Sequence, residues 1–257
     1  MFTQNEIINS LKKQLALDFN CKPKDFDKTE NVITLPALKE GRRIFSKETS
    51  FLQMATLGGN AVISADKKLH SWLTEWAKAK KGFWIFEQHN YFELNDKLRE
   101  FGYKLALTHH MFLPTAEIVS VKPNFEYRFI ETNEIMQFYG RPEFPNAICE
   151  CFKPERPDVL VVLAMNGKKI MGMAGCSADS KKFRQIGIDV LPEYRKLGIG
   201  ATLVKLLRNE TFKRGAIPYY GTSLSNLGSW KIALSSGFKP AWIECETQKL
   251  ENKEFVK

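Results

Sequence analysis

A glycine turn between an expected strand and a long helix, over residues 185–215, constrains the fold of this chain most. Residues 185–190 read as a strand, and Pro192 follows it. The run Tyr194-Arg195-Lys196-Leu197-Gly198-Ile199-Gly200 then leads into a helix that ends at Lys213-Arg214-Gly215. One side of this helix carries Ile199, Leu203, Leu206 and Leu207. Backbone N–H groups at a helix N-terminus carry partial positive charge, and glycines let phosphate oxygens approach the backbone. The segment therefore predicts an anion-binding site.

The spacing in this segment disfavours two common phosphate motifs. A dinucleotide fingerprint requires a third small residue where Leu203 stands, and no Gly-Lys-Ser or Gly-Lys-Thr follows as it does in a P-loop. NAD and nucleoside triphosphates are therefore disfavoured as ligands.

The longer pattern around the turn resembles a known superfamily. Val190-x-Pro192-x-Tyr194-Arg195-x-x-Gly198-x-Gly200 is followed by Tyr219-Tyr220-Gly221-Thr222, and then by Asn226, Ser229, Ala233 and Gly237-Phe238. In this order the sequence resembles the GNAT superfamily of acetyl-CoA-dependent N-acetyltransferases, over about residues 127–245. The whole chain also looks like a bacterial two-domain subgroup of that superfamily, through Gly58-Gly59-Asn60-Ala61-Val62, residues 174–180 and residues 185–190.

The resemblance implies a fold and two domains. We expect an α/β (α+β) protein in which residues 121–257 form a GNAT domain, with a mixed, mostly antiparallel central sheet flanked by helices. Residues 1–120 are expected to form a smaller N-terminal α/β domain that shapes the acceptor site or an interface.

The resemblance also implies where acetyl-CoA binds, as a cosubstrate and without a metal. The strand that pairs with the pantetheine arm falls on Ile188, Asp189 and Val190. The pyrophosphate loop falls on Lys196, Leu197, Gly198, Ile199, Gly200 and Ala201. Independently of the resemblance, the charges of Arg195 and Lys196 beside a helix N-terminus suit two phosphates, so Arg195 is a cofactor-binding candidate as well. Asn226 matches a polar contact to the cofactor. Two structural alternatives stay open, because Gly198 could serve only as a tight turn and Asn226 only as a helix cap.

Members of the superfamily transfer the acetyl group by direct attack of an amine on the thioester. The resemblance implies that the N–H of Val190 stabilises the oxyanion. The carboxylate that some members carry early in this strand falls near Arg184 or Gln185, and neither can act as a base. Asp189 is the nearest candidate, and a structural role for it is equally compatible with the sequence. The weaker candidates are Glu150 and Asp179.

The acid that protonates the departing thiolate is also missing from its usual position. The tyrosine that many members use falls on Ala233. Tyr220 or Tyr219 could replace it, although a tyrosine on a strand is more often part of the packing. A thiol with a pKa near ~8.5 leaves tolerably without help.

These observations predict an N-acetyltransferase that uses acetyl-CoA and an unidentified amine acceptor. A catalytically decayed CoA-binding sensor or interaction protein is the alternative, because the usual base and tyrosine are missing. The net charge of +9 favours anionic partners. No basic stripe with interleaved aromatic residues accompanies that charge, so nucleic acid is disfavoured. The sequence leaves an oligomer open.

The remaining patterns indicate an ordinary folded chain of 257 residues, 44% of them hydrophobic. Thr3-x-x-Glu6 reads as a helix capping box and not as an export signal. The five scattered cysteines (Cys21, Cys149, Cys151, Cys176 and Cys245) lack zinc-ligand spacing and are typical of reduced thiols in a cytoplasmic protein. No apolar run approaches the length of a membrane helix, so no membrane partner is expected.

Alternating patterns predict further elements on both sides of residues 114–123. In the first half we expect strands over 60–64 and 83–86, helices over 69–76 and 91–101, and an extended segment over 103–113. The second half predicts a strand over 127–130, a helix over 131–139 and a hairpin of residues 158–165 and 168–176 through Asn166-Gly167.

Overall fold

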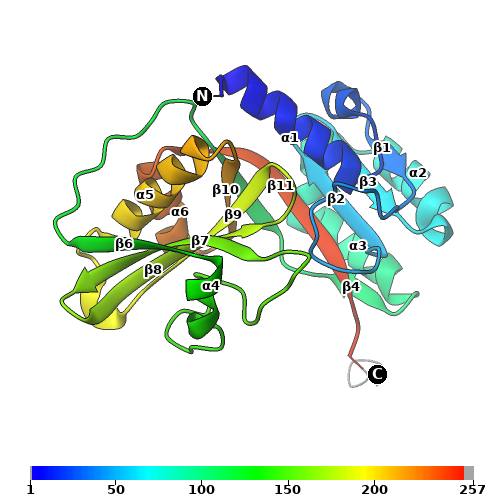
Figure 1. Cartoon of the computed structure of the whole chain (residues 1–257). Helices are drawn as coiled ribbons and strands as arrows, with labels where there is room; N and C mark the ends of the chain where they lie inside the picture. Colours follow the sequence, from blue (N-terminus) through cyan, green and yellow to red (C-terminus); the bar gives the residue numbers. More distant parts are fainter. Residues whose placement is uncertain (1, 252–257) are drawn as a thin grey trace. The chain divides into compact units, whose positions relative to one another are not determined.

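The computed structural model of the chain describes residues 2–251, and they divide into two compact units (Figure 1). Unit 1 contains residues 2–7, 43–45 and 111–240, and unit 2 contains residues 8–42, 46–110 and 241–251. The chain therefore passes between the units several times. The division into domains at residues 1–120 and 121–257 stays a prediction.

Unit 1 is built around a mixed, mostly antiparallel sheet, and its strands follow the order β5-β10-β9-β8-β7-β6. Its strands are β5 (His109–Pro114, from Met111 onward), β6 (Glu126–Glu131), β7 (Asp158–Asn166), β8 (Lys169–Ala178), β9 (Phe183–Val190) and β10 (Ile217–Ser223). Its helices are α4 (Thr132–Ile135), α5 (Ile199–Lys213), α6 (Leu227–Ser235) and the 3-10 turns η4 (Met136–Phe138) and η5 (Pro192–Tyr194). Neighbouring strands from β6 to β9 are antiparallel, whereas β9 and β10 are parallel.

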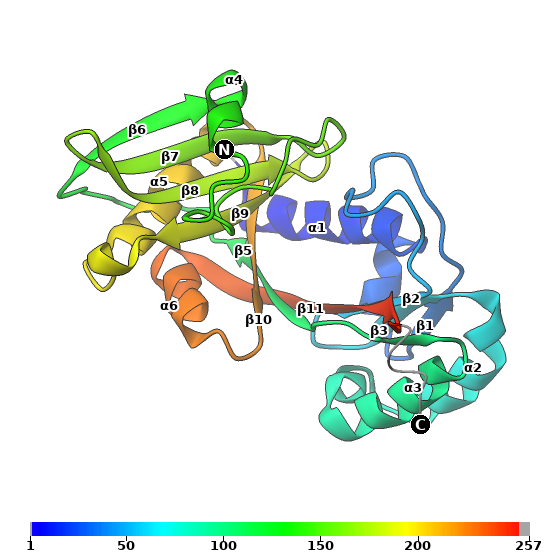
Figure 2. The same cartoon turned by 90° about the horizontal axis from the view of Figure 1, so that it is seen from below.

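Helices cover both faces of this sheet. Leu203 and Leu207 of α5 are fully buried in one cluster with Leu160 and Val162 of β7. On the opposite face, Ile135 of α4 packs in a second cluster with other residues of β6 to β8. Figure 2 shows α4 and α5 on opposite sides of the sheet. The predicted fold class is therefore confirmed: a mostly antiparallel sheet with helices on its faces.

Unit 2 is smaller, and its strand order is β1-β3-β2-β11, with β4 paired to β11. Its strands are β1 (Val32–Thr34), β2 (Leu52–Thr56), β3 (Ala61–Ala65), β4 (Tyr103–Leu105) and β11 (Phe238–Lys249, from Ala241 onward). Its helices are α1 (Gln4–Asp18, from Ile8 onward), α2 (His70–Lys78), α3 (Gln88–Arg99) and the 3-10 turns η1 (Pro23–Asp27), η2 (Lys67–Leu69) and η3 (Gly82–Phe86). Leu73, Trp76, Leu94 and Leu98 place the apolar stripes of α2 and α3 in one buried core.

Local signals in the sequence account for several of these elements. The N–H of Glu6 donates to Thr3 Oγ1, and the N–H of Thr3 donates to Glu6 Oε2, which is the predicted capping box. Asp66 caps η2 by accepting from the N–H of Lys68. Gly167 takes a positive φ of 56° in the predicted turn of the β7–β8 hairpin.

The strand predicted over residues 83–86 is wrong, because these residues form the 3-10 turn η3. The backbone of this turn forms local hydrogen bonds: the N–H of Trp84 donates to Lys81 O, and the N–H of Glu87 donates to Trp84 O. The side chain of Asn90 also donates to Trp84 O. A short apolar run does not distinguish a strand from a buried turn, and these local hydrogen bonds select the turn.

α1 and α5 are the longest helices of the described chain, with 15 residues each. Neither of them, nor any other helix within residues 2–251, combines the length and the hydropathy of a membrane-spanning segment.

Candidate cofactor and acceptor site

The glycine turn forms an uncapped helix N-terminus. Gly198 is the N-cap of α5, and its φ of 78° lies in the left-handed region that favours glycine. Lys196 also has a positive φ, of 64°. The helix begins with a hydrogen bond from the N–H of Thr202 to Gly198 O. No side chain caps the helix, so the N–H groups of its first turn are available to an anion.

Beside this turn the parallel pairing of β9 and β10 stops short of the strand ends. The register runs from Phe183↔Ile217 to Ile186↔Tyr220 and includes no later pair. Residues 187–190 of β9 and residues 221–223 of β10 continue beyond it, and Figure 2 shows β10 turning away from β9. We call the opening between these two stretches the splay.

The hydrogen-bond alternation of β9 directs two residues into the splay. Leu191 donates its N–H to Met171 O, on the β8 side. In an antiparallel pair, alternate residues point their backbone groups toward and away from the partner strand. Asp189 therefore faces β8, whereas the N–H and C=O groups of Ile188 and Val190 face the splay. Arg195 Nε donates to Val190 O at 3.0 Å, which holds the guanidinium at the end of the strand.

Side-chain packing brings the strand end and the helix N-terminus together. Ile188 and Val190 pack against the core cluster that contains Ile199 of α5. A Cβ placed on Gly200 would lie 3.5 Å from Val190 Cγ2 and 3.8 Å from Ile188 Cγ1. The predicted pantetheine strand and the predicted pyrophosphate loop are therefore adjacent in space.

On the opposite face of β9, Asp189 holds a crossing segment of backbone. Asp189 Oδ2 accepts from the N–H of Asn146 at 2.6 Å and from the N–H of Ala147 at 2.8 Å, and Oδ1 accepts from Asn146 Nδ2 at 2.8 Å. This segment lies directly on the cross-strand pair Gly175↔Gly187. A Cβ on Gly187 would lie only 1.9 Å from Asn146 O, and one on Gly175 only 2.4 Å from Ala147 O. Asp189 therefore has a structural task, and its catalytic role stays a prediction.

Tyr220 and Asn226 have protein partners as well. Tyr220 is buried, and its hydroxyl lies 2.7 Å from Ser229 Oγ. Burial raises the pKa of Tyr220 above its usual value, so the phenol stays protonated at neutral pH. Asn226 Oδ1 accepts from the N–H of Ser229 at 3.1 Å and so caps α6. Their predicted roles in catalysis and cofactor binding stay predictions.

Sequence reasoning missed a buried polar network at the start of β9. Arg156 Nε donates to Asp179 Oδ1 at 2.5 Å, and Arg156 Nη2 donates to Gln185 Oε1 at 3.1 Å. Tyr219 donates its hydroxyl proton to Asp179 Oδ2 and lies 3.3 Å from Gln185 Oε1. Asp179 is fully buried and also accepts from Ser177 Oγ at 2.7 Å. No local motif signals this network, because its members come from four separate segments.

The segment Arg43–Phe45 lies against this network in unit 1. The N–H of Ile44 donates to Asp179 O at 3.0 Å. The ring of Phe45 lies 5.3 Å from Arg43 Cζ and 4.8 Å from Arg156 Cζ, which places two guanidinium groups against one aromatic ring. The segment thereby helps to fix Arg156.

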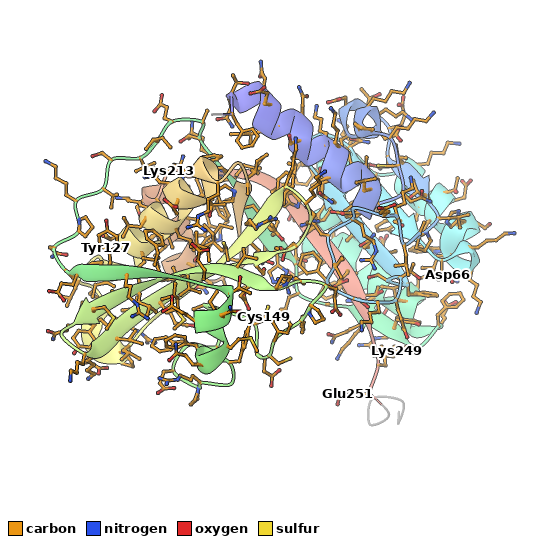
Figure 3. All side chains as sticks on the ribbon, viewed as in Figure 1. Asp66, Tyr127, Cys149, Lys213, Lys249 and Glu251 are labelled. Atoms are coloured by element: carbon orange, nitrogen blue, oxygen red, sulfur yellow. The ribbon has the colours of Figure 1, made fainter. Side chains whose placement is uncertain are left out.

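Of the weaker base candidates, Glu150 is exposed and Asp179 is saturated by hydrogen-bond donors. Figure 3 labels Cys149 in the segment between α4 and β7, where its N–H donates to Asp158 Oδ2. Burial raises the pKa of the Cys149 thiol to about 11. Throughout residues 2–251, no three His, Cys, Asp or Glu side chains gather as a metal-binding group.

Comparisons with known proteins agree with this geometry. Residues 126–238 match the family model described as the acetyltransferase (GNAT) family. No curated protein matches the chain. The solved GCN5-related N-acetyltransferase from Kribbella flavida is 11% identical, covers 96% of each chain and superposes with a TM-score of 0.51, which shows a shared fold.

Two other solved structures resemble part of the chain. A putative GNAT acetyltransferase from Novosphingobium aromaticivorans is 14% identical, with 59% of this chain and 69% of that chain covered and a TM-score of 0.47. A putative acetyltransferase from Salmonella typhimurium, solved with acetyl-CoA, is 12% identical, with 51% of this chain and 96% of that chain covered and a TM-score of 0.35. The chain therefore contains a GNAT acetyltransferase domain at residues 126–238.

Proposed function

We propose that the chain transfers an acetyl group from acetyl-CoA to an amine acceptor. The observation that carries this proposal is the splay beside an uncapped helix N-terminus. The N–H and C=O groups of Ile188 and the N–H of Val190 face the splay outside the β9–β10 pairing, whereas Val190 O accepts from Arg195 Nε. An amide-bearing arm can pair with a free strand edge as an added strand does, and phosphates suit a helix N-terminus.

The residues around the turn fit a pyrophosphate. A Cβ at Gly198 would meet nothing within 4 Å, so the space over this residue is open. Arg195 and Lys196 are exposed cations that flank the turn. Leu197, Ile199, Gly200 and Ala201 complete the proposed loop with their backbone. Acetyl-CoA itself supplies the activated thioester that the acceptor attacks.

The backbone of β9 can stabilise the charge that develops during attack. The N–H of Val190 faces the splay and is the proposed donor to the thioester oxygen. The neighbouring N–H of Ile188 faces the same way and supports the pantetheine arm. Both positions are fixed by the pairing with β8 and by packing against α5.

Proton transfer is the step that differs from the usual pattern. An ammonium with a pKa near ~10 must lose a proton before it attacks. The carboxylates of Asp189 and Asp179 each accept hydrogen bonds from three donors. An added proton on either carboxylate would have to displace one of these donors. We therefore propose that the proton leaves through water, and that Asp189 acts by positioning β9.

A CoA-binding sensor without catalysis is the second candidate. The three donors on each of Asp189 and Asp179 favour it, as does the hydrogen bond between the hydroxyl of Tyr220 and Ser229. In this case the splay and the loop would still bind CoA, and no acetyl group would be transferred.

Release of free CoA from acetyl-CoA, followed chromatographically with a panel of amines, separates the two candidates. The enzyme proposal predicts amine-dependent release together with an acetylated amine of matching amount. CoA binding without amine-dependent release supports the sensor. Absence of CoA binding contradicts both.

A further inference from the structure

We infer that Gln185 binds an oxygen atom of the acceptor, so that the acceptor is an amine carrying a carbonyl or carboxylate group. This inference rests on the proposed acetyl transfer. It is based on the side-chain amide of Gln185. The network of Arg156, Asp179 and Tyr219 orients this amide, which lies where β9 and β10 begin to separate.

The network determines which way the amide of Gln185 points. Arg156 Nη2 and the hydroxyl of Tyr219 both lie against Gln185 Oε1, at 3.1 and 3.3 Å. An arginine has no acceptor, so the atom that faces it must be the amide oxygen. The amide nitrogen of Gln185 therefore points away from the network, and it makes no hydrogen bond with residues 2–251.

The network is rigid enough to keep this orientation. Asp179 is fully buried and bridges Arg156 and Tyr219. Ser177 donates to Asp179 Oδ1 and accepts from Arg156 Nη2 at 3.2 Å, which closes the network. The ring of Phe45 covers the guanidinium of Arg156. Rotation of the amide would place its NH₂ group against the N–H of Arg156 Nη2, which cannot accept a hydrogen bond.

The amide nitrogen lies at the apex of the splay. Gln185 pairs with Tyr219, one pair before the last pair of β9 and β10. Its Nε2 would lie 3.4 Å from a Cβ placed on Gly221, the first residue of β10 beyond the pairing. The nitrogen thus lies where the two strands begin to separate.

The amide also lies on the face that remains for the acceptor. Side chains alternate along a strand, so Gln185, Gly187 and Asp189 share one face of β9. Ile188 and Val190 share the other face, where they pack against the core cluster of α5. On this face the Asn146–Ala147 backbone covers Gly187, so an acceptor that contacts Gln185 would approach Val190 along the β10 side of β9, through the splay.

The chemistry of a lone amide N–H donor defines the acceptor. It binds carbonyl or carboxylate oxygen and has no favourable interaction with an ammonium group. Gln185 lies about 17 Å along the strand from Val190, at about 3.3 Å per residue. The amine and the oxygen are therefore expected at separate ends of an extended acceptor.

The kinetic test compares amino amides of increasing length, from glycinamide upward, with n-alkylamines of matching length. Gln185→Glu keeps an oxygen for Arg156 and Tyr219 and replaces the amide donor by a second acceptor. The ratio of KM for amino amides to KM for alkylamines should rise roughly 3- to 10-fold, the effect of one lost hydrogen bond. Gln137→Glu, at an exposed glutamine of unit 1, is the matched control and should leave the ratio unchanged. An unchanged ratio in Gln185→Glu would overturn the inference.

A parallel series of amino acids, which carry a carboxylate in place of the amide, distinguishes the two sources of oxygen. A lower KM for the amino acids identifies a carboxylate, because a charged acceptor strengthens the hydrogen bond. A lower KM for the amino amides identifies a neutral carbonyl. Equal KM values for both series and for alkylamines would contradict a role for Gln185.

A binding test does not depend on turnover. The side-chain amide signals of Gln185 in the ¹⁵N-labelled protein are assigned by their loss in Gln185→Glu. With CoA present, the amino amides should shift these signals, and alkylamines of the same length should not. Equal shifts or no shifts would overturn the inference. If the signals respond as expected while no acetyl group is transferred, the proposed activity fails, and Gln185 binds the carbonyl oxygen of a ligand that is not acetylated.

Discussion

Gly187 leaves no room for any side chain, because the backbone of the crossing segment lies directly on it. A Cβ at this position would come within 1.9 Å of Asn146 O. We predict that Gly187→Ala lowers the free energy of unfolding by about 1–3 kcal/mol, the usual cost of overpacking. Gly59→Ala is the control, since a Cβ there would meet nothing within 4 Å and the residue has no positive φ. Denaturant unfolding measures both. Equal stability of the two variants would contradict the close packing of this segment.

We expect a substitution of Asp189 to act mainly on the stability of the fold and less on catalysis. In Asp189→Asn, the remaining oxygen can still accept from the N–H groups of Asn146 and Ala147, but without the negative charge, and the new NH₂ group would face Asn146 Nδ2. We predict a loss of about 1.5–3 kcal/mol in the free energy of unfolding at neutral pH. If stability is unchanged while kcat falls by about 10²- to 10⁴-fold, Asp189 is a general base after all.

The cysteines are predicted to differ in reactivity by their burial. Burial raises the pKa of the thiols to about 12 for Cys21 and Cys176, and to about 11 for Cys149 and Cys245. Only thiolates react readily, so these four should be alkylated slowly at pH 8, and faster as the pH rises toward these values. Cys151 is exposed and should react first. Peptide mapping after brief alkylation tests this order. Rapid labelling of Cys176 in the folded protein would contradict it.

At the scale of elements, the sequence predicts what is encoded locally. The stripe of α5 and the turn at Gly167 are local signals, and both elements form as expected. β11 is not predictable in this way, because its pairing with β2 joins residues 243–246 to residues 53–56. The turn η3 reads as a strand in the sequence, since an apolar run of five residues fits either structure.

The candidate site also has one part that the sequence predicts and one part that it does not. The loop from Arg195 to Ala201 is continuous in sequence, so its glycine pattern by itself indicates an anion site. The proposed acceptor side depends on Arg156, Asp179, Gln185 and Tyr219, whose hydrogen bonds join separate segments of the chain. Only their hydrogen bonds reveal that Gln185 presents a donor, and no spacing in the sequence contains this information.

At the scale of the whole molecule, each of the two units is built from segments that lie far apart in the sequence. In unit 1 the ring of Phe2 lies 6.0 Å from that of Phe212, and Gln4 Oε1 accepts from the N–H of Ala116 at 3.0 Å. Arg43 Cζ lies 5.7 Å from the ring of Tyr219. The fold of unit 1 therefore uses residues far upstream of residue 111.

A fragment of residues 111–257 lacks these contacts and also leaves β11 without β2. We predict that it neither unfolds cooperatively nor binds CoA with the affinity of the full chain. Calorimetry and near-ultraviolet circular dichroism measure this. A fragment with the melting temperature and CoA affinity of the full chain would show that unit 1 folds without the upstream residues.

The most direct test of the account is the affinity for CoA of Gly198→Asp compared with Gly198→Asn. Both side chains must adopt the same positive φ of 78°, and asparagine and aspartate tolerate it similarly. They differ in the negative charge placed at the N-terminus of α5. If phosphates bind there, isothermal titration calorimetry should give a dissociation constant roughly 5- to 10-fold higher for Gly198→Asp than for Gly198→Asn. Equal affinities in the two folded variants would contradict the assignment of this turn to acetyl-CoA.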